Sequence, residues 1–249
     1  MAIDSKRLLN KLDNFLRQND YDSAKSHLLY WLNEANETGD EKAVLLINNE
    51  LMGLCRKLGQ KDEAIFYAES ALNGVRKMGI EDNVGAATTY LNSATVFKAF
   101  GMASESIGLF ERTQEIYEKN LKSDDDRLAG LYNNMALALV DLKRFDEAKA
   151  LYERAISVLE MVQGKEPEQA ITYLNLASCA EAELGLENAQ RIIEANIEKA
   201  MEKLEASEDK VSGNYAFVCE KCATVFGYYG YFYYENILKE RYKRIYEGN

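Results

Sequence analysis

The sequence predicts an all-α protein, a right-handed superhelix of about six helical hairpins. Three observations lead to this prediction. Proline occurs once in 249 residues, so almost nothing interrupts long helices. Gly, Asn and Asp recur at regular intervals, as expected for short connections between helices. Between these connections, apolar residues are spaced three or four apart, which is the period of a helix with one buried face.

One segment near the middle of the chain shows the hairpin pattern most clearly. It reads LYNNMALALVDLKRFDEAKALYERAISVL. Tyr132, Ala136 and Leu139 lie on one helical stripe, and Ala148 and Tyr152 lie on a second stripe after a short polar turn. The alanines allow two antiparallel helices to approach, and the large side chains fill the space beside them.

This large-small-large pattern followed by a well-placed alanine resembles the tetratricopeptide repeat. The same phase recurs from Asn48, Tyr90 and Tyr173, and the two ends of the chain fit it more loosely, as terminal repeats usually do. We therefore expect a single solenoid over residues 1–249. Its repeats are expected near residues 4–38, 40–79, 82–121, 124–164, 167–206 and 208–249, the last being an aromatic capping hairpin.

The repeat period is longer than the usual value of about 34 residues. Equivalent positions after each turn are spaced 40, 42, 42, 41 and 46 residues apart. These positions are Ala24, Ala64, Ser106, Ala148, Ala189 and Glu235. The long period resembles the subtype found in kinesin light chains and in bacterial peptide-sensing proteins.

Three segments that precede predicted helices contain residues typical of helix starts. They read TGDEKA, SDDDRLAG and GKEPEQA. Aspartate at a helix start accepts hydrogen bonds from free backbone N–H groups, and proline is tolerated in the first turn. We interpret Asp124, Asp125 and Asp126 as part of such a start rather than as a metal site.

The formal net charge of −11 disfavours nucleic acid and anionic membrane surfaces as partners. No apolar run approaches the roughly 20 residues needed to span a bilayer. The first residues carry charges every few positions, unlike a secretory signal, so we expect a cytoplasmic protein.

No catalytic motif, cofactor motif or complete metal-binding motif is present, so we expect a non-enzymatic protein without cofactors. The single histidine, His27, is interpreted as a packing or surface residue. Cys219 and Cys222 have the spacing of half a zinc site, but the other half is missing. We interpret them as small residues on a packed helix face.

The resemblance implies a concave groove, lined by the first helix of each hairpin, that binds a protein or peptide. An asparagine recurs on this helix in each of the first five repeats, and a ladder of carboxamides could pair with the backbone of an extended chain. Arg56, Lys57 and Lys98 would attract acidic segments. The alternatives are asparagines that serve helix stacking or solubility, and basic residues that are simply solvated. The predicted groove residues are Asn10, Asn49, Arg56, Lys57, Asn92, Lys98, Asn133, Asn134, Asn175 and Ser178.

Eight of the sixteen tyrosines lie in residues 211–249. Tyr234, Leu238, Tyr242 and Ile245 form an apolar stripe that should cover the preceding hairpin, with tyrosine rings filling a wide gap next to Glu235. This indicates a capping hairpin. The alternatives are a structural protein that forms homodimers through these aromatic residues, and a small-molecule sensor.

Overall fold

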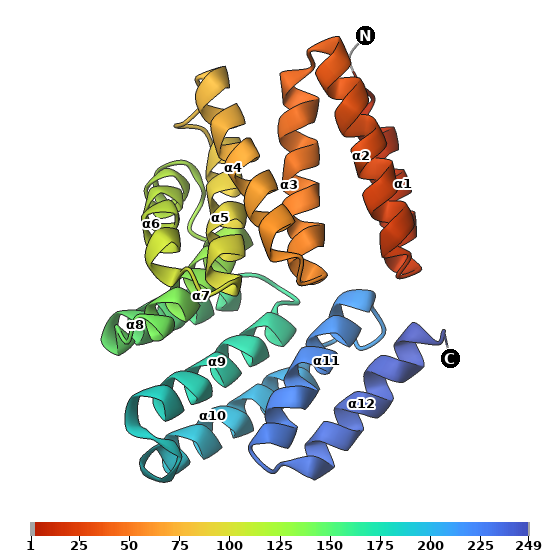
Figure 1. Ribbon diagram of the computed structural model, residues 1–249. Coiled ribbons are helices and arrows are strands. Elements are labelled where there is room, and N and C mark those ends of the chain that lie inside the picture. Colours follow the sequence, from red (N-terminus) through yellow and green to blue (C-terminus); the bar gives the residue numbers. More distant parts are fainter. Residues whose placement is uncertain (1–2, 249) are drawn as a thin grey trace. The chain divides into compact units, whose positions relative to one another are not determined.

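The computed structural model describes residues 3–248, which contain twelve helices and no strand (Figure 1). The first six helices are α1 (Ser5–Arg17), α2 (Tyr21–Thr38), α3 (Glu41–Lys57), α4 (Lys61–Met78), α5 (Val84–Ala99) and α6 (Ala103–Asn120). The other six are α7 (Asp126–Asp141), α8 (Phe145–Glu160), α9 (Glu166–Leu184), α10 (Leu186–Ala206), α11 (Gly213–Tyr228) and α12 (Phe232–Tyr246).

Consecutive helices pair into six hairpins, from α1–α2 to α11–α12, which confirms the predicted all-α hairpin fold. The chain divides into two compact units, Met1–Asn120 and Leu121–Asn249, with three hairpins each. In the first unit α3 packs against α5, and in the second α9 packs against both α7 and α11. A single solenoid over residues 1–249 stays a prediction. Within the described part of the chain, no helix is both long and apolar enough to cross a membrane.

Five of the six hairpins turn through a residue with a left-handed backbone. These residues are Asn19, Gly59, Gly101, Lys143 and Gly230, with φ between 55° and 82°. The N–H of the next residue then bonds a carbonyl in the last turn of the first helix, as from Gln60 to Cys55 at 2.9 Å and from Tyr231 to Phe226 at 2.9 Å. This bond satisfies a carbonyl that the helix end would otherwise leave free.

The fifth hairpin turns differently. The N–H of Gly185 bonds the Glu181 carbonyl oxygen at 2.8 Å, and α10 begins at the very next residue, Leu186. Gly185 has φ 78° and ψ 157°, an extended conformation with positive φ that is essentially restricted to glycine. The repeat pattern is therefore locally broken between α9 and α10.

The predicted helix starts are confirmed at two aspartates. Asp40 accepts from the N–H of Ala43 at 3.1 Å, and Asp125 accepts from the N–H of Arg127 at 3.1 Å. The Arg127 guanidinium also donates to Asp125, at 2.6 Å, and this hydrogen bond lowers the pKa of the Asp125 carboxyl. Among residues 3–248, no three His, Cys, Asp or Glu side chains are grouped as a metal ion would require.

Small residues lie where the two helices of a hairpin meet. Ala24, Ala64, Ser106, Ala148 and Ala189 are all completely buried. The last hairpin has Glu235 at this position, and Gly227 lies opposite, where an added Cβ would approach the Glu235 carboxyl to 2.6 Å. Room for the larger side chain therefore comes from a missing side chain on α11, a compensation that the sequence analysis did not predict.

Candidate binding face on the first helices

Two of the predicted asparagines in the first unit bond to each other. The amide of Asn92 on α5 donates to the carbonyl oxygen of Asn49 on α3, with Nδ2 and Oδ1 3.0 Å apart. The Asn49 amide in turn donates to the backbone oxygen of Leu45 at 2.9 Å and to Oγ1 of Thr89 at 3.2 Å. A chain of hydrogen bonds thus joins α3 to α5 across the half-buried surface of both helices.

The second unit repeats this arrangement between α7 and α9. The Asn175 amide lies 3.5 Å from Oδ1 of Asn133, a long contact. The Asn133 amide donates to Oγ1 of Thr172 at 2.9 Å. In both units a threonine three positions before the second asparagine accepts from the first asparagine. Two copies of one arrangement indicate a feature of the repeat.

These contacts divide the asparagines into two kinds. Asn49 and Asn133 use their carboxamides to join neighbouring helices, as the stacking alternative proposed. Asn92 and Asn175 each donate one N–H, and their second N–H and carbonyl oxygen have no partner among residues 3–248. A carboxamide can donate two bonds and accept two, so each of these side chains keeps capacity for a further partner.

The other predicted groove residues do not join this arrangement. Asn134 donates to the Gly130 carbonyl oxygen of its own helix at 2.8 Å. The Lys57 ammonium lies 4.7 Å from the centre of the Tyr21 ring. Asn10, Arg56 and Ser178 are exposed, and Lys98 is half-buried.

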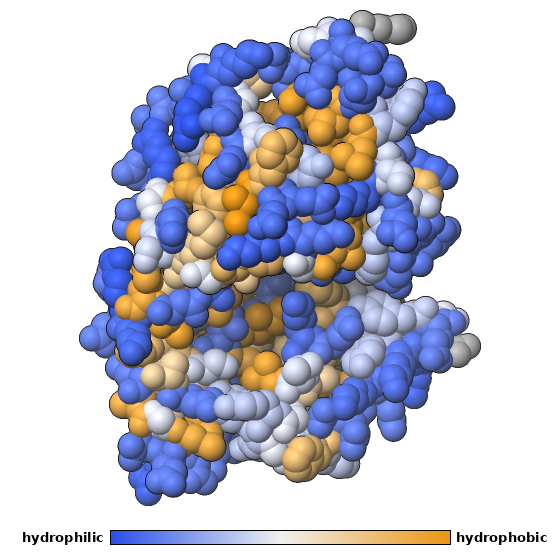
Figure 2. All heavy atoms as spheres, in the orientation of Figure 1, coloured by the Kyte–Doolittle hydropathy of each residue, from blue (hydrophilic) through white to orange (hydrophobic). Residues whose placement is uncertain are grey.

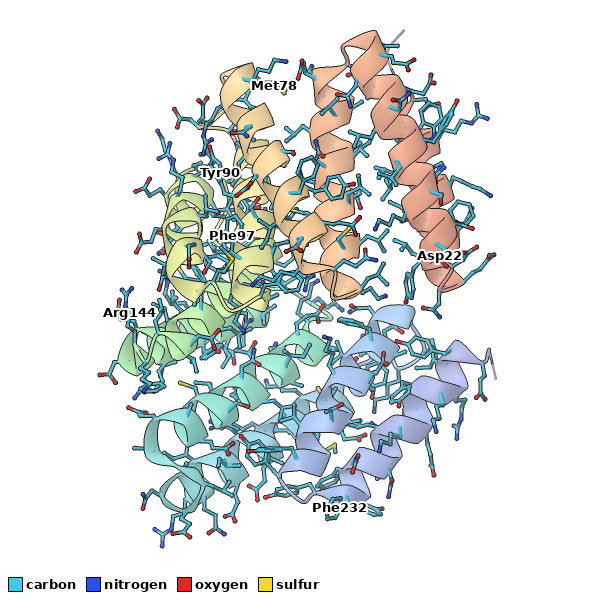
Figure 3. All side chains as sticks on the ribbon, viewed as in Figure 1. Asp22, Met78, Tyr90, Phe97, Arg144 and Phe232 are labelled. Atoms are coloured by element: carbon cyan, nitrogen blue, oxygen red, sulfur yellow. The ribbon has the colours of Figure 1, made fainter. Side chains whose placement is uncertain are left out.

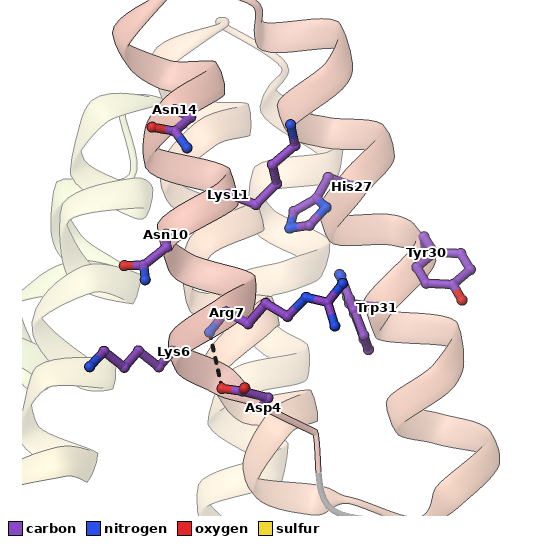
Figure 4. A pocket seen from close by; sticks show the side chains of 9 residues that line it. All are labelled: Asp4, Lys6, Arg7, Asn10, Lys11, Asn14, His27, Tyr30 and Trp31. Carbon is purple, nitrogen blue, oxygen red and sulfur yellow. Dashed lines mark hydrogen bonds between the residues drawn. The ribbon is translucent and has the colours of Figure 1, made fainter.

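The first hairpin has a cleft of about 740 Å³ (Figure 4). Asn10 was predicted to line a groove, but this cleft was not predicted from the sequence. Its lining consists of Asp4, Lys6, Arg7, Asn10, Lys11, Asn14, His27, Tyr30 and Trp31. His27 packs edge-on between the rings of Phe15 and Trp31, with centroids 5.8 and 6.4 Å away, and its Nε2 lies 3.1 Å from the Leu8 carbonyl oxygen. This confirms His27 as a packing residue.

The aromatic C-terminal stretch is divided between core and surface. Tyr215 and Phe226 are buried against α9 and α10, together with Leu238 from the predicted stripe. Phe232 and Tyr233 are 62% and 74% exposed, and Figure 3 shows Phe232 at the start of α12. The same hairpin therefore covers its neighbour and presents aromatic rings to solvent.

The two cysteines of this hairpin belong to its core. Cys219 and Cys222 are buried and unpaired. Burial raises the pKa of the Cys219 thiol to about 11, so the thiolate that metals and disulfide exchange require is disfavoured. Their interpretation as small core residues is confirmed.

Residues 127–206, which run from the second residue of α7 to the end of α10, match the tetratricopeptide repeat family model. This part of the chain is therefore similar to tetratricopeptide repeats. In Arabidopsis thaliana, the protein KINESIN LIGHT CHAIN-RELATED 1 is 22% identical over 189 residues, which are 73% of this chain. The match spans only 31% of the length of that relative.

Two solved structures show the same fold. The crystal structure of BtubC (BKLC) from P. vanneervenii has a TM-score of 0.68 at 20% identity and covers 82% of each chain. A kinesin light chain from Podosopora anserina with nearly identical TPR-like repeats has a TM-score of 0.55 at 18% identity. The match covers 81% of the present chain and 94% of the Podosopora anserina chain. The resemblance to kinesin-light-chain repeats is thereby confirmed.

Proposed function

We propose that this repeat protein is a non-enzymatic scaffold, and that within each of its two units the first helices of the hairpins bind an extended protein segment. The observation that carries the proposal is the spare hydrogen-bonding capacity of Asn92 and Asn175. An extended peptide offers one N–H and one C=O per residue, which are the groups that a carboxamide can pair with. Tetratricopeptide repeats generally serve as scaffolds for protein partners, which supports the same class of function.

Within each unit, a hydrogen bond between the paired asparagines also holds one of them in place. Asn92 and Asn175 are anchored to Asn49 and Asn133 on the neighbouring helix, so less side-chain freedom is lost on binding. Arg56 and Lys57 lie at the end of α3, where their charges would favour acidic partner segments. On the face drawn in Figure 2, hydrophilic residues predominate, with apolar residues gathered in patches.

The proposal is tested by capturing partners from the native cell extract, identifying one, and measuring its affinity for purified variants. Asn92→Ala with Asn175→Ala should weaken binding at least about fivefold, since each asparagine would lose at least one neutral hydrogen bond worth roughly 0.5–1.5 kcal/mol. Asn134→Ala is the matched control, because that amide bonds its own helix. Equal affinity of the double variant, with unchanged helicity, would refute peptide recognition by these asparagines.

A second candidate is self-association through the C-terminal hairpin. The exposed rings of Tyr228, Phe232 and Tyr233 favour it, because large aromatic side chains are enriched at protein interfaces. Light scattering during size-exclusion chromatography should then show a dimer that Phe232→Ser with Tyr233→Ser converts to a monomer. A wild-type monomer at all concentrations would exclude this candidate.

A further inference from the structure

A second pocket, of about 480 Å³, lies between α10 and the turn that joins α11 to α12. It is lined by Leu186, Glu187, Gln190, Ile193, Glu194, Tyr229, Gly230 and Tyr231. None of these residues belongs to the asparagine face on α7 and α9. An occupant of this pocket is therefore a question separate from the function proposed above.

The apolar part of the pocket is preformed. Ile193 is 4% exposed and anchored in the core of the second unit. The Tyr231 ring stacks on Tyr234, with centroids 6.3 Å apart. The Tyr229 hydroxyl donates to Glu181 at 2.7 Å. These contacts fix two aromatic rings beside an aliphatic surface, so little ordering would be required on binding.

The polar part of the pocket is acidic. Gln190 donates to Glu194 at 3.0 Å, and Glu187 forms no ion pair with any residue in the described range. Arg191 lies between the two glutamates in sequence, yet it is exposed and pairs with neither. Burial, together with the charges of Glu194 and Glu198, raises the pKa of Tyr231, as expected where the local field is negative.

The altered turn of the fifth hairpin contributes the exposed apolar wall. In this hairpin α10 begins directly after Gly185, and Gly185 itself has an extended backbone with positive φ. The left-handed helical residue that forms the turn in the other five hairpins is therefore missing between α9 and α10. Leu184 and Leu186 on either side of Gly185 are 41% and 56% exposed. An exposed leucine beside an acidic, aromatic-lined pocket is available to contact a partner.

We propose that this pocket binds an arginine or lysine side chain of a partner protein. Both side chains carry a cationic head on an apolar stem. The stem would lie on Leu186 and Ile193, and the head would meet Glu187 and Glu194 beside the tyrosine rings, which attract cations. An acidic side chain would be repelled by the two carboxylates, and a purely apolar one would desolvate them without providing a partner.

The test uses the full chain with labelled leucine and isoleucine methyl groups, observed by NMR. The probe is an acetylated, amidated pentapeptide, Ala-Gly-Arg-Gly-Ala, compared with versions that have Lys, Gln or Glu at the centre. The Arg and Lys peptides should shift the methyl signals of Leu186 and Ile193, and the Gln and Glu peptides should not. Raising the salt concentration should weaken the effect, since screening shortens the range of the carboxylate field.

Two charge-matched variants decide whether the pocket carboxylates are responsible. Glu187→Gln with Glu194→Gln should weaken Arg-peptide binding at least about fivefold. Glu202→Gln with Glu208→Gln removes the same charge from exposed positions outside the pocket and should leave binding unchanged. Equal binding of the Gln peptide, retained binding by the pocket variant, or shifts confined to other methyl groups would overturn the proposal. Concentration-dependent shifts of the same methyls without peptide would also overturn it, assigning the pocket to a second copy of the chain.

Discussion

Two buried tyrosines show how differently one residue type is accommodated in this protein. The Tyr152 hydroxyl on α8 is buried with no hydrogen-bond partner among residues 3–248, and burial raises its pKa. The Tyr215 hydroxyl on α11 donates to the Leu204 carbonyl oxygen at 3.3 Å and accepts from Arg241 at 3.0 Å. Both rings fill core space, but only one polar group is satisfied.

Removing each hydroxyl should therefore have opposite effects on stability. Tyr152→Phe removes an unsatisfied polar group and should raise the free energy of unfolding by about 1 kcal/mol. Tyr215→Phe breaks two hydrogen bonds, leaves a carbonyl and a guanidinium without this partner, and should lower it by about 1–2 kcal/mol. Urea unfolding of both variants measures the difference. Destabilisation by both substitutions to the same extent would contradict this account.

The burial of a residue is easier to predict from the sequence than its hydrogen bonds are. Tyr152 was placed correctly on a buried stripe because its neighbours follow the helical period. The Tyr215–Arg241 contact joins residues 26 positions apart in two helices, and no local pattern encodes it. The asparagines are an intermediate case. The repeat phase put Asn49 and Asn92 on the same face, but their mutual hydrogen bond depends on how α3 packs against α5.

At the scale of the helical hairpin, Gly227 and Glu235 form a size-compensated pair. In the first four hairpins, the residue eight positions before the small residue is Leu16, Arg56, Lys98 or Val140. In the last hairpin this position is Gly227, and the small residue is replaced by Glu235, whose carboxylate accepts from Lys239 at 2.5 Å. The fixed spacing of eight residues is sufficient to predict this exchange from the sequence.

The compensation predicts that substitutions at these two positions are coupled. Alanine is favoured over glycine inside a helix by about 1 kcal/mol. Gly227→Ala should not gain this in the wild type, because its Cβ would displace the Glu235 carboxylate. In the Glu235→Ala background the gain should appear, giving a coupling energy of about 1 kcal/mol in urea unfolding.

Gly130→Ala on α7 is the control for that cycle. An added Cβ there would meet no atom within 4 Å apart from its chain neighbours and the backbone of its own helix, so the helix-propensity gain should appear in either background. If Gly227→Ala stabilises the wild type as much as Gly130→Ala does, the pair is not coupled.

The hydrogen bonds at the start of α3 should make the free energy of unfolding decrease as the pH becomes acidic. The Asp40 carboxylate accepts from the N–H groups of Ile3 at 3.0 Å and Ala43 at 3.1 Å, and these bonds lower its pKa, the first more than the second. A pKa lowered by folding contributes stability above the unfolded value of about 3.9, and this contribution is lost as pH falls through the folded value.

Asp40→Asn keeps an N-cap acceptor but cannot titrate. The variant should be less stable than the wild type at about pH 6, and the difference should shrink steadily below about pH 4. Urea midpoints measured across this range provide the check. A constant difference at all pH values would mean that the Asp40 charge does not contribute.

At the scale of the whole molecule, the repeat period predicts the number of hairpins because each hairpin must bury its apolar face against a neighbour. It does not predict where the pattern breaks. The turn at Gly185 departs from the other five, and the leucines on either side of it are exposed. On α10, Ile192 is 45% exposed, whereas Ile193 and Ile197 are buried. A one-residue shift on a helix turns a side chain by about 100°.

The last hairpin should be essential for the stability of its unit. Its buried residues share one core with α9 and α10, including Leu174, Ile193 and Ile197. Deleting residues 208–249 would expose this surface, and losses of several kcal/mol should lower the melting temperature by on the order of 10 °C. The truncated chain should also aggregate, because a contiguous apolar face would be left uncovered.

Phe226→Ala separates the role of the core from that of the exposed rings. Phe226 is fully buried, so its truncation should cost about 3–5 kcal/mol, whereas Tyr233→Ala, at 74% exposure, should cost little. Hydrogen exchange of the Phe226→Ala variant should show lost protection first in α9 and α10, the helices that the hairpin covers.

If the chain without residues 208–249 stays monomeric and melts at the wild-type temperature, the hairpin is not a cap. Its exposed aromatic residues would then be better explained as a dedicated binding surface.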